Sequence, residues 1–198
     1  MKRNFIVLVL LLIFIDQAIK IPVSKLLPEP DACLCLTLRV NVTLIEGIFY
    51  FKPMQNIHGG WIPNMLDYMM PIYIGVPITV LGIIIFIATY RFMMYWAFDW
   101  DKYKNLPVVF LTAALSGGIC SLIDTVFWGG SVDYILLFDW FIFDLKDVYL
   151  SFSGATLVLY VIIFCIKYYR LSKEERREFD KNFKFFGWLK SGLPLKPG

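Results

Sequence analysis

The stretch that decides how this chain folds is SGGICSLIDTVFWGGSVDYILLFDWFIFDLKD, residues 116–147. It carries five aspartates and one lysine, and long apolar segments precede and follow it. A carboxylate close to hydrocarbon is costly unless it is paired or performs a function. The stretch therefore predicts a place where carboxylates are held by partners or used in chemistry. These aspartates are Asp124, Asp133, Asp139, Asp144 and Asp147.

The composition of the whole chain is typical of a membrane protein. Of its 198 residues, 59% are hydrophobic and 18% are aromatic, whereas ordinary soluble domains are less apolar and more highly charged. The net charge of +3 is too small to create a strong field for nucleic acid, so no nucleic-acid partner is expected. The sequence therefore predicts a single polytopic membrane domain.

Four apolar segments are long enough to cross a hydrocarbon core, which takes about 20 helical residues. They are residues 4–21, 68–90, 106–123 and 148–168. The first could also be a cleavable signal peptide, since Lys2 and Arg3 precede its apolar run. Asp16 and Lys20 interrupt that run and no small-residue cleavage site follows, which favours a retained anchor.

Basic residues near the span ends predict the orientation. They gather at the N-terminus, between residues 91 and 105, and in the tail, so these regions are expected on the cytoplasmic side. The connections 22–67 and 124–147 then face outward. We interpret residues 1–170 as the four-span domain. Residues 171–198 form a basic amphipathic tail, expected to lie on the inner membrane surface.

Residues 33–54 alternate between apolar and polar side chains, which is the period of a strand. Glu46-Gly47 provides a turn, so we expect a small antiparallel sheet on the outer membrane surface. Cys33 and Cys35 form a C-x-C pair without a second pair or a neighbouring histidine, and no metal site is predicted from them.

Two pairs of ionisable residues stand out. Asp16 and Lys20 are four residues apart, so on a helix they lie on one face and can pair, or Lys20 can extend its ammonium group to the interface. Asp133 follows the Gly129-Gly130 turn, and Asp147 precedes the last span, where capping a helix is its simpler explanation. If these two carboxylates meet in a poorly solvated site, one keeps a proton and the other remains a base, as in aspartic proteases.

Four motifs in order make the chain resemble lipoprotein signal peptidase, the signal peptidase II family, over approximately residues 5–170. The motifs are DQAIK at 16–20, the segment 56–61, GGICSLIDT at 117–125 with SVD at 131–133, and FDLKD at 143–147. The resemblance implies four transmembrane helices with a small extracytoplasmic antiparallel β-sheet and a short extracytoplasmic helix, expected within 134–146.

The same resemblance implies an aspartic endopeptidase of the bacterial cytoplasmic membrane, with both termini inside and its active site at the outer face. It would remove signal peptides from diacylglyceryl-modified prolipoproteins, working among membrane lipids as a monomer without metal or cofactor. By this resemblance Asp133 and Asp147 are catalytic. The residues assigned to substrate binding are Asn56, Ser121 and Trp61, and those assigned to supporting the site are Asp16, Lys20, Asp124 and Asp144.

The chain departs from the family pattern at four motif positions. Ser121 and Asp144 stand where the family has asparagine, Thr125 where it has arginine, and Lys146 where it has alanine. We expect Asp144 to repel Asp147, with the Lys146 side chain directed elsewhere. These departures keep open a second hypothesis, a catalytically impaired relative that binds lipidated peptides without cleaving them. A proton or ion conductor is a weaker third hypothesis, because the acids crowd one face instead of crossing the bilayer.

Overall fold

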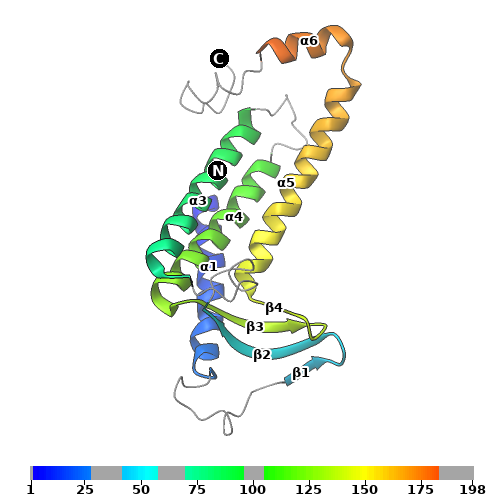
Figure 1. Ribbon diagram of the computed structural model, residues 1–198. Helices are drawn as coiled ribbons and strands as arrows, with labels where there is room; N and C mark the ends of the chain where they lie inside the picture. Colours follow the sequence, from blue (N-terminus) through cyan, green and yellow to red (C-terminus); the bar gives the residue numbers. More distant parts are fainter. Residues whose placement is uncertain (1, 28–41, 58–69, 96–104, 183–198) are drawn as a thin grey trace.

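The structure, a computed structural model, describes residues 2–27, 42–57, 70–95 and 105–182. Four long helices run side by side, with a small sheet at one end of the bundle (Figure 1). They are α1 (Lys2–Ser24), α3 (Ile72–Tyr95), α4 (Leu106–Ile123) and α5 (Leu145–Arg170). All four are long and apolar enough to cross a membrane. The four predicted spans are therefore confirmed, with α5 beginning three residues earlier than expected.

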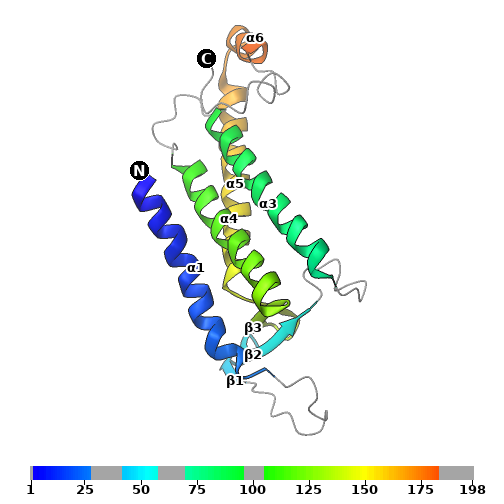
Figure 2. The same ribbon diagram turned by 90° about the vertical axis from the view of Figure 1, so that its left-hand side faces the viewer.

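Helix α4 is the central element of the bundle. It contacts α1, α3 and α5, and Figure 2 shows it between α1 and α3. A Cβ atom at Gly117 would come within 2.7 Å of Leu150 on α5, and one at Gly118 within 2.9 Å of Ile83 on α3. Small residues let membrane helices approach closely, so this glycine pair allows α4 to pack against both neighbours at once.

The end of the bundle away from the sheet is held by an apolar core. Phe110 and Ala114 of α4 pack there with Met93, Tyr160 and Phe164 from the neighbouring helices. The Tyr160 hydroxyl donates a hydrogen bond of 2.6 Å to the backbone carbonyl of Met93. This bond satisfies a polar group that would be costly in an apolar setting.

Helix α4 continues into a π-helical segment, Asp124–Trp128, before the chain turns. Gly129 ends that segment in the left-handed region, with φ of 65°, and its N–H donates to the Asp124 carbonyl. Gly130 follows with φ of 152°, and a Cβ there would lie 2.6 Å from the backbone oxygen of Asn56. Glycine is therefore required where the chain passes from α4 into the sheet.

The sheet has four antiparallel strands in sequence order. They are β1 (Val42–Ile45), β2 (Phe49–Asn56), β3 (Ser131–Leu137) and β4 (Phe141–Phe143). The pairing of β2 with β3 is irregular between Phe51 and Met54, where Pro53 cannot donate a hydrogen bond. The predicted sheet is confirmed for residues 42–54, and its residues 33–41 lie outside the described ranges.

The short helix expected within 134–146 was wrongly placed, because most of those residues belong to β3 and β4. Leu136 and Leu137 pair with β2 on one side and with β4 on the other, so β3 is an inner strand. Phe138 and Asp139, with φ of 51° and 57°, form the turn between β3 and β4. In the sheet the backbone N–H and C=O groups of these residues pair with neighbouring strands, whereas a short helix would leave the backbone groups at both its ends unpaired.

Helix α6 (Lys173–Asn182) lies at the end of α5 opposite to the sheet (Figure 1). Ser172 and Glu175 exchange hydrogen bonds at its start, which is a capping box. Phe179 of α6 packs against Phe164 and Tyr168 of α5. The described part of the predicted tail is thus a short helix with an aromatic contact to the bundle.

Candidate active site

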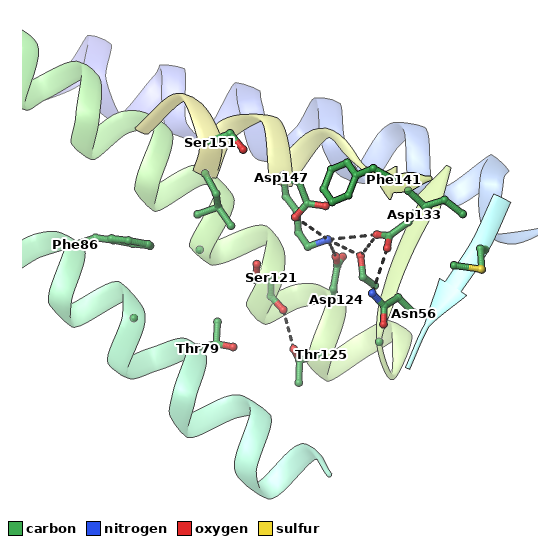
Figure 3. A pocket seen from close by; sticks show the side chains of 18 of the residues that line it. Asn56, Thr79, Phe86, Ser121, Asp124, Thr125, Asp133, Phe141, Asp147 and Ser151 are labelled. Atoms are coloured by element: carbon green, nitrogen blue, oxygen red, sulfur yellow. Dashed lines mark hydrogen bonds and ion pairs between the residues drawn. The ribbon is translucent and has the colours of Figure 1, made fainter. Parts of the chain in front are cut away.

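The aspartates of the quoted stretch gather where the sheet meets the helices. A cavity of about 750 Å³ lies there, lined by residues of β2, α3, α4, the π-helical segment, the β3–β4 hairpin and α5. Side chains of Asn56, Asp124, Asp133 and Asp147 point toward one another on its wall (Figure 3). The chain thus brings to one place carboxylates from the π-helical segment, β3 and α5.

Asp133 is positioned by strand geometry. Ser131 and Asp133 are two residues apart on β3, so their side chains share one face of the sheet. The Ser131 hydroxyl donates a hydrogen bond to Asp133 Oδ1, and Asn56 Nδ2 donates to Oδ2 at 3.4 Å. Asp133 is only 3% exposed. Burial raises its pKa above the ordinary aspartate value, although Lys146, Ser131 and Asn56 oppose that rise.

Asp147 is positioned by the first turn of α5. Asp144 is the residue that caps this helix, which corrects the expectation that Asp147 does so. The two form a capping box, in which Asp147 N–H donates to Asp144 Oδ1 at 3.2 Å and Asp144 N–H donates to Asp147 Oδ2 at 3.4 Å. The Asp147 side chain is 35% exposed, against 5% for that of Asp133, so Asp147 is the member open to water.

The carboxylates of Asp133 and Asp147 meet in space. Each of Asp133, Asp144 and Asp147 offers an oxygen within 4.8 Å of the others. Such a cluster has the spacing to hold a cation, and the Lys146 ammonium group lies among these carboxylates. The site therefore contains a positive charge supplied by the chain itself.

The Lys146 side chain points into the carboxylate cluster, which corrects the expectation that it is directed elsewhere. Its Nζ lies 2.6 Å from Asp144 Oδ2, 3.3 Å from Asp124 Oδ2, 3.7 Å from Asp133 Oδ1 and 3.9 Å from Asp147 Oδ1. It also donates a hydrogen bond to the Ser131 hydroxyl. The long lysine side chain folds back from the first turn because four carboxylates attract its charge.

Lys20 is fully buried and does not extend to the interface, which corrects the alternative in which it reaches outward. Its Nζ lies 2.9 Å from Asp16, as the i,i+4 spacing predicted, and 2.7 Å from both Asp124 and Asp144. Burial alone would raise the pKa of Asp144, but the ammonium groups of Lys146 and Lys20 outweigh it and lower that pKa. Asp144 is therefore a buried, ionised partner and not a solvated surface group.

The remaining candidates lie around this cluster. Ser121 and Thr125 line the cavity, and the Thr125 hydroxyl donates to the Ser121 carbonyl at 2.9 Å (Figure 3). Trp61 lies outside the described residues. Asp139 is exposed in the β3–β4 turn and does not belong to the cluster.

Sequence reasoning gave no site role to Ser131, Lys146 or Gln17. Ser131 precedes Asp133 by two residues, and a strand there would have placed both side chains on one face. A lysine in the first turn of a helix opposes the helix dipole, so Lys146 next to two aspartates signalled a nearby acidic partner. Gln17 follows Asp16, donates to it at 2.9 Å and accepts from the Trp128 indole at 3.1 Å, which ties α1 to the π-helical segment.

Four apolar helices, a four-stranded sheet and a carboxylate pair beside a cavity define a polytopic membrane protein with a site suited to acid–base hydrolysis. The chain belongs to the signal peptidase II family, since the family model described as signal peptidase (SPase) II matches residues 8–164. This is a family of aspartic-type peptidases that act on lipoproteins in bacterial membranes.

Two solved structures have a similar fold, and both are described as a bacterial membrane enzyme structure by the in meso method. The one at 2.3 Å resolution is 18% identical with a TM-score of 0.58, over 86% of this chain and 92% of that one. The one at 1.9 Å resolution is 16% identical with a TM-score of 0.52, over 80% and 92% respectively. A comparison with curated proteins finds no significant match.

Proposed function

We propose that this protein is a membrane-embedded aspartic endopeptidase that removes signal peptides from diacylglyceryl-modified prolipoproteins. The observation that carries the proposal is the approach of Asp133 and Asp147, whose carboxylates lie within 4.8 Å at the wall of the cavity. Membership of the signal peptidase II family supports the substrate class. In this proposal the cavity opens at the outer face of the bacterial cytoplasmic membrane, and both termini are cytoplasmic.

The two carboxylates divide the chemistry between them. One carboxyl holds the proton that the pair shares and acts as the acid, protonating the scissile carbonyl oxygen. The other is ionised and acts as the base, taking a proton from the attacking water, to which Asp147 is the more open of the two. When the tetrahedral intermediate collapses, the carboxyl that took the water proton gives it to the leaving amine. The other carboxylate takes its proton back from a hydroxyl of the intermediate, so the pair regains its starting state.

The other site residues hold this arrangement. Asn56 donates to Asp133, and its position on the cavity wall also allows it to meet the substrate backbone. Lys20 holds Asp16, Asp124 and Asp144 as a buried support beneath the pair. Ser121 and the apolar residues of the cavity would line the path of the lipidated peptide. No step of this scheme calls on a metal or a cofactor.

A prolipoprotein cleavage assay with purified protein in lipid tests the proposal. Asp133→Asn and Asp147→Asn should each abolish cleavage, because either change removes a group that must gain or lose a proton. Asp139→Asn is the matched control, since Asp139 is exposed in a turn and asparagine accepts its positive φ. Cleavage at the wild-type rate in either pair variant would refute the assignment.

One observation favours a second candidate function. The Lys146 ammonium lies 3.7 Å from Asp133 and 3.9 Å from Asp147, where the pair would share its proton. If this charge keeps both carboxylates ionised, the protein binds lipidated peptides without cleaving them. Lipopeptide binding by the wild type with no product after hours of incubation would decide for this candidate.

A further inference from the structure

The Lys146 ammonium group is shared by four carboxylates at the cavity. Lys146 is buried, and its Nζ lies within 3.9 Å of Asp124 on the π-helical segment, Asp133 on β3, and Asp144 and Asp147 at the start of α5. Its strongest contacts are to Asp144 and to the Ser131 hydroxyl. A side chain with so many partners in one place is held in a single orientation.

Ser131 connects Lys146 to the pair. Lys146 donates to the Ser131 oxygen, so the hydroxyl proton is directed away from the ammonium group and toward Asp133 Oδ1. A hydroxyl has one proton, and its two carboxylate acceptors are Asp133 Oδ1 and Asp144 Oδ2, the latter at 3.3 Å. Asp133 is the closer of the two, so it is the better acceptor. The orientation of the Asp133 carboxylate therefore depends on Lys146 through Ser131.

The charge of Lys146 acts on the proton shared by the pair. A cation within about 4–6 Å of a carboxyl favours its ionised form. At 3.7 Å and 3.9 Å, Lys146 is close to both members, so it stabilises the doubly ionised pair relative to the pair that shares one proton. The positive charge lowers the pH at which the pair loses that proton.

We propose that Lys146 is a positioning residue of the carboxylate pair: it orients Asp133 through Ser131, and its charge sets the upper pH limit at which the pair retains its shared proton. This inference rests on the proposed function, because it assigns a role to Lys146 within the same site. A lysine beside the pair is compatible with catalysis in this scheme, but the pH range over which the enzyme is active ends at a lower alkaline limit.

Other titratable groups lie around Lys146 and its carboxylate partners. They are Asp16 and Lys20 on α1, Cys120 on α4, Asp124 on the π-helical segment, Tyr134 on β3, and Asp144 and Tyr149 at α5. Lys20 is the other cation of this set, but its contacts are to Asp16, Asp124 and Asp144. Lys146 is thus the cation with contacts to both Asp133 and Asp147 in the part of the chain that the structure describes.

Two measurements on Lys146→Met test the inference. One is the alkaline limb of the pH–rate profile for prolipoprotein cleavage. The other is an infrared titration of the protonated carboxyl band, assigned by its change in Asp133→Asn and Asp147→Asn, which needs no turnover. Both midpoints should rise by about 1–3 pH units, the range over which a nearby opposite charge shifts a carboxyl. Lys146→Arg keeps the charge, and its infrared midpoint should stay near that of the wild type.

A second comparison covers the case in which Lys146→Met does not fold. Asp144→Asn alone removes an anion and should lower both midpoints, whereas adding Lys146→Ala to it should raise them again. The double variant removes one charge of each sign and carries the residues that the family has at both positions, so it is the better-balanced protein. Equal midpoints in Asp144→Asn and in the double variant would overturn the inference.

The outcomes separate this inference from the proposed function. An unchanged infrared midpoint in folded Lys146→Met overturns the role of Lys146 even if the wild type cleaves its substrate. A raised midpoint in a protein whose wild type yields no product overturns the proposed function and leaves the coupling of Lys146 to the pair in place. A loss of rate that is equal at every pH, with no movement of either midpoint, also contradicts the inference.

Discussion

Replacing Lys20 by methionine removes an ammonium group that three buried carboxylates share. Its Nζ lies 2.9 Å from Asp16 and 2.7 Å from Asp124 and Asp144, and neither Lys20 nor Asp16 is exposed at all. Methionine has a similar length and fits an apolar space, so the substitution changes charge more than volume. Asp144 and Asp124 would keep Lys146, at 2.6 Å and 3.3 Å, whereas the ion pair of Asp16 with Lys20 would be lost.

Breaking a buried ion pair by removing one partner costs about 3–5 kcal/mol, because the other charge remains buried without compensation. We expect Lys20→Met to lower the free energy of unfolding by that amount. Asp16→Asn should cost less, about 1.5–3 kcal/mol, the range for one hydrogen bond to a charged group. The difference arises because Lys20 keeps Asp124 and Asp144 when Asp16 is neutralised.

An SDS titration in mixed micelles, followed by far-UV circular dichroism, measures these free energies. Lys25→Met is the matched control, since Lys25 is exposed just beyond α1 and its replacement should change stability by less than about 0.5 kcal/mol. Equal small losses for Lys20→Met and Lys25→Met would refute the reasoning. A loss for Asp16→Asn as large as that for Lys20→Met would show that the three carboxylates do not share the lysine in the way that the distances indicate.

Four other outcomes can be measured on the same protein. The pKa of Asp133 is raised in the folded protein, so its carboxyl contributes stability below the ordinary aspartate pKa of 3.8 and loses that contribution as the pH rises through the folded pKa. Asp133→Asn should therefore be more stable than the wild type at pH 7, and by a smaller margin at pH 4. The pKa of Asp144 is lowered in the folded protein, so its carboxylate contributes stability above pH 3.8 and loses that contribution as the pH falls through the folded pKa. Asp144→Asn should therefore be less stable than the wild type at pH 7, and by a smaller margin in acid. Chemical denaturation of both variants at several pH values measures these differences. Truncation after Leu171 should leave cleavage at the wild-type rate, since α6 lies at the far end of α5 from the cavity, and a folded truncated protein without activity would contradict this. Gly130→Ala should reduce cleavage at least tenfold, because the added Cβ would meet the Asn56 backbone oxygen at 2.6 Å and displace β2 from β3. Tenfold corresponds to a loss of about 1.4 kcal/mol in transition-state stabilisation. A normal rate would show that the contact between the two strands tolerates this displacement.

Local pattern was sufficient for the main elements of the fold. The apolar runs predicted four spans because a helix must be about 20 residues long to cross the hydrocarbon core, and the third was predicted at its observed bounds, Leu106–Ile123. The alternation around Glu46-Gly47 predicted two strands and the turn between them, which β1, Gly47 and β2 confirm. The strands after Gly130 were missed, because their partner β2 lies about 80 residues earlier in the chain, and inter-strand pairing is non-local.

The sequence by itself determined which aspartates come together, because the motifs carry them at fixed spacings, but it did not assign Lys146 to the site. It also determined the pair Asp16–Lys20, since an i,i+4 contact follows from the helix alone. Only the tertiary structure decided where the two lysine side chains end. Lys20 reaches Asp124 across 104 residues of sequence, and Lys146 turns back toward Asp124 and Asp133. A lysine has four flexible side-chain bonds, so its direction is set by the charges around it, and those charges come together only when α1, the π-helical segment, β3 and α5 have packed.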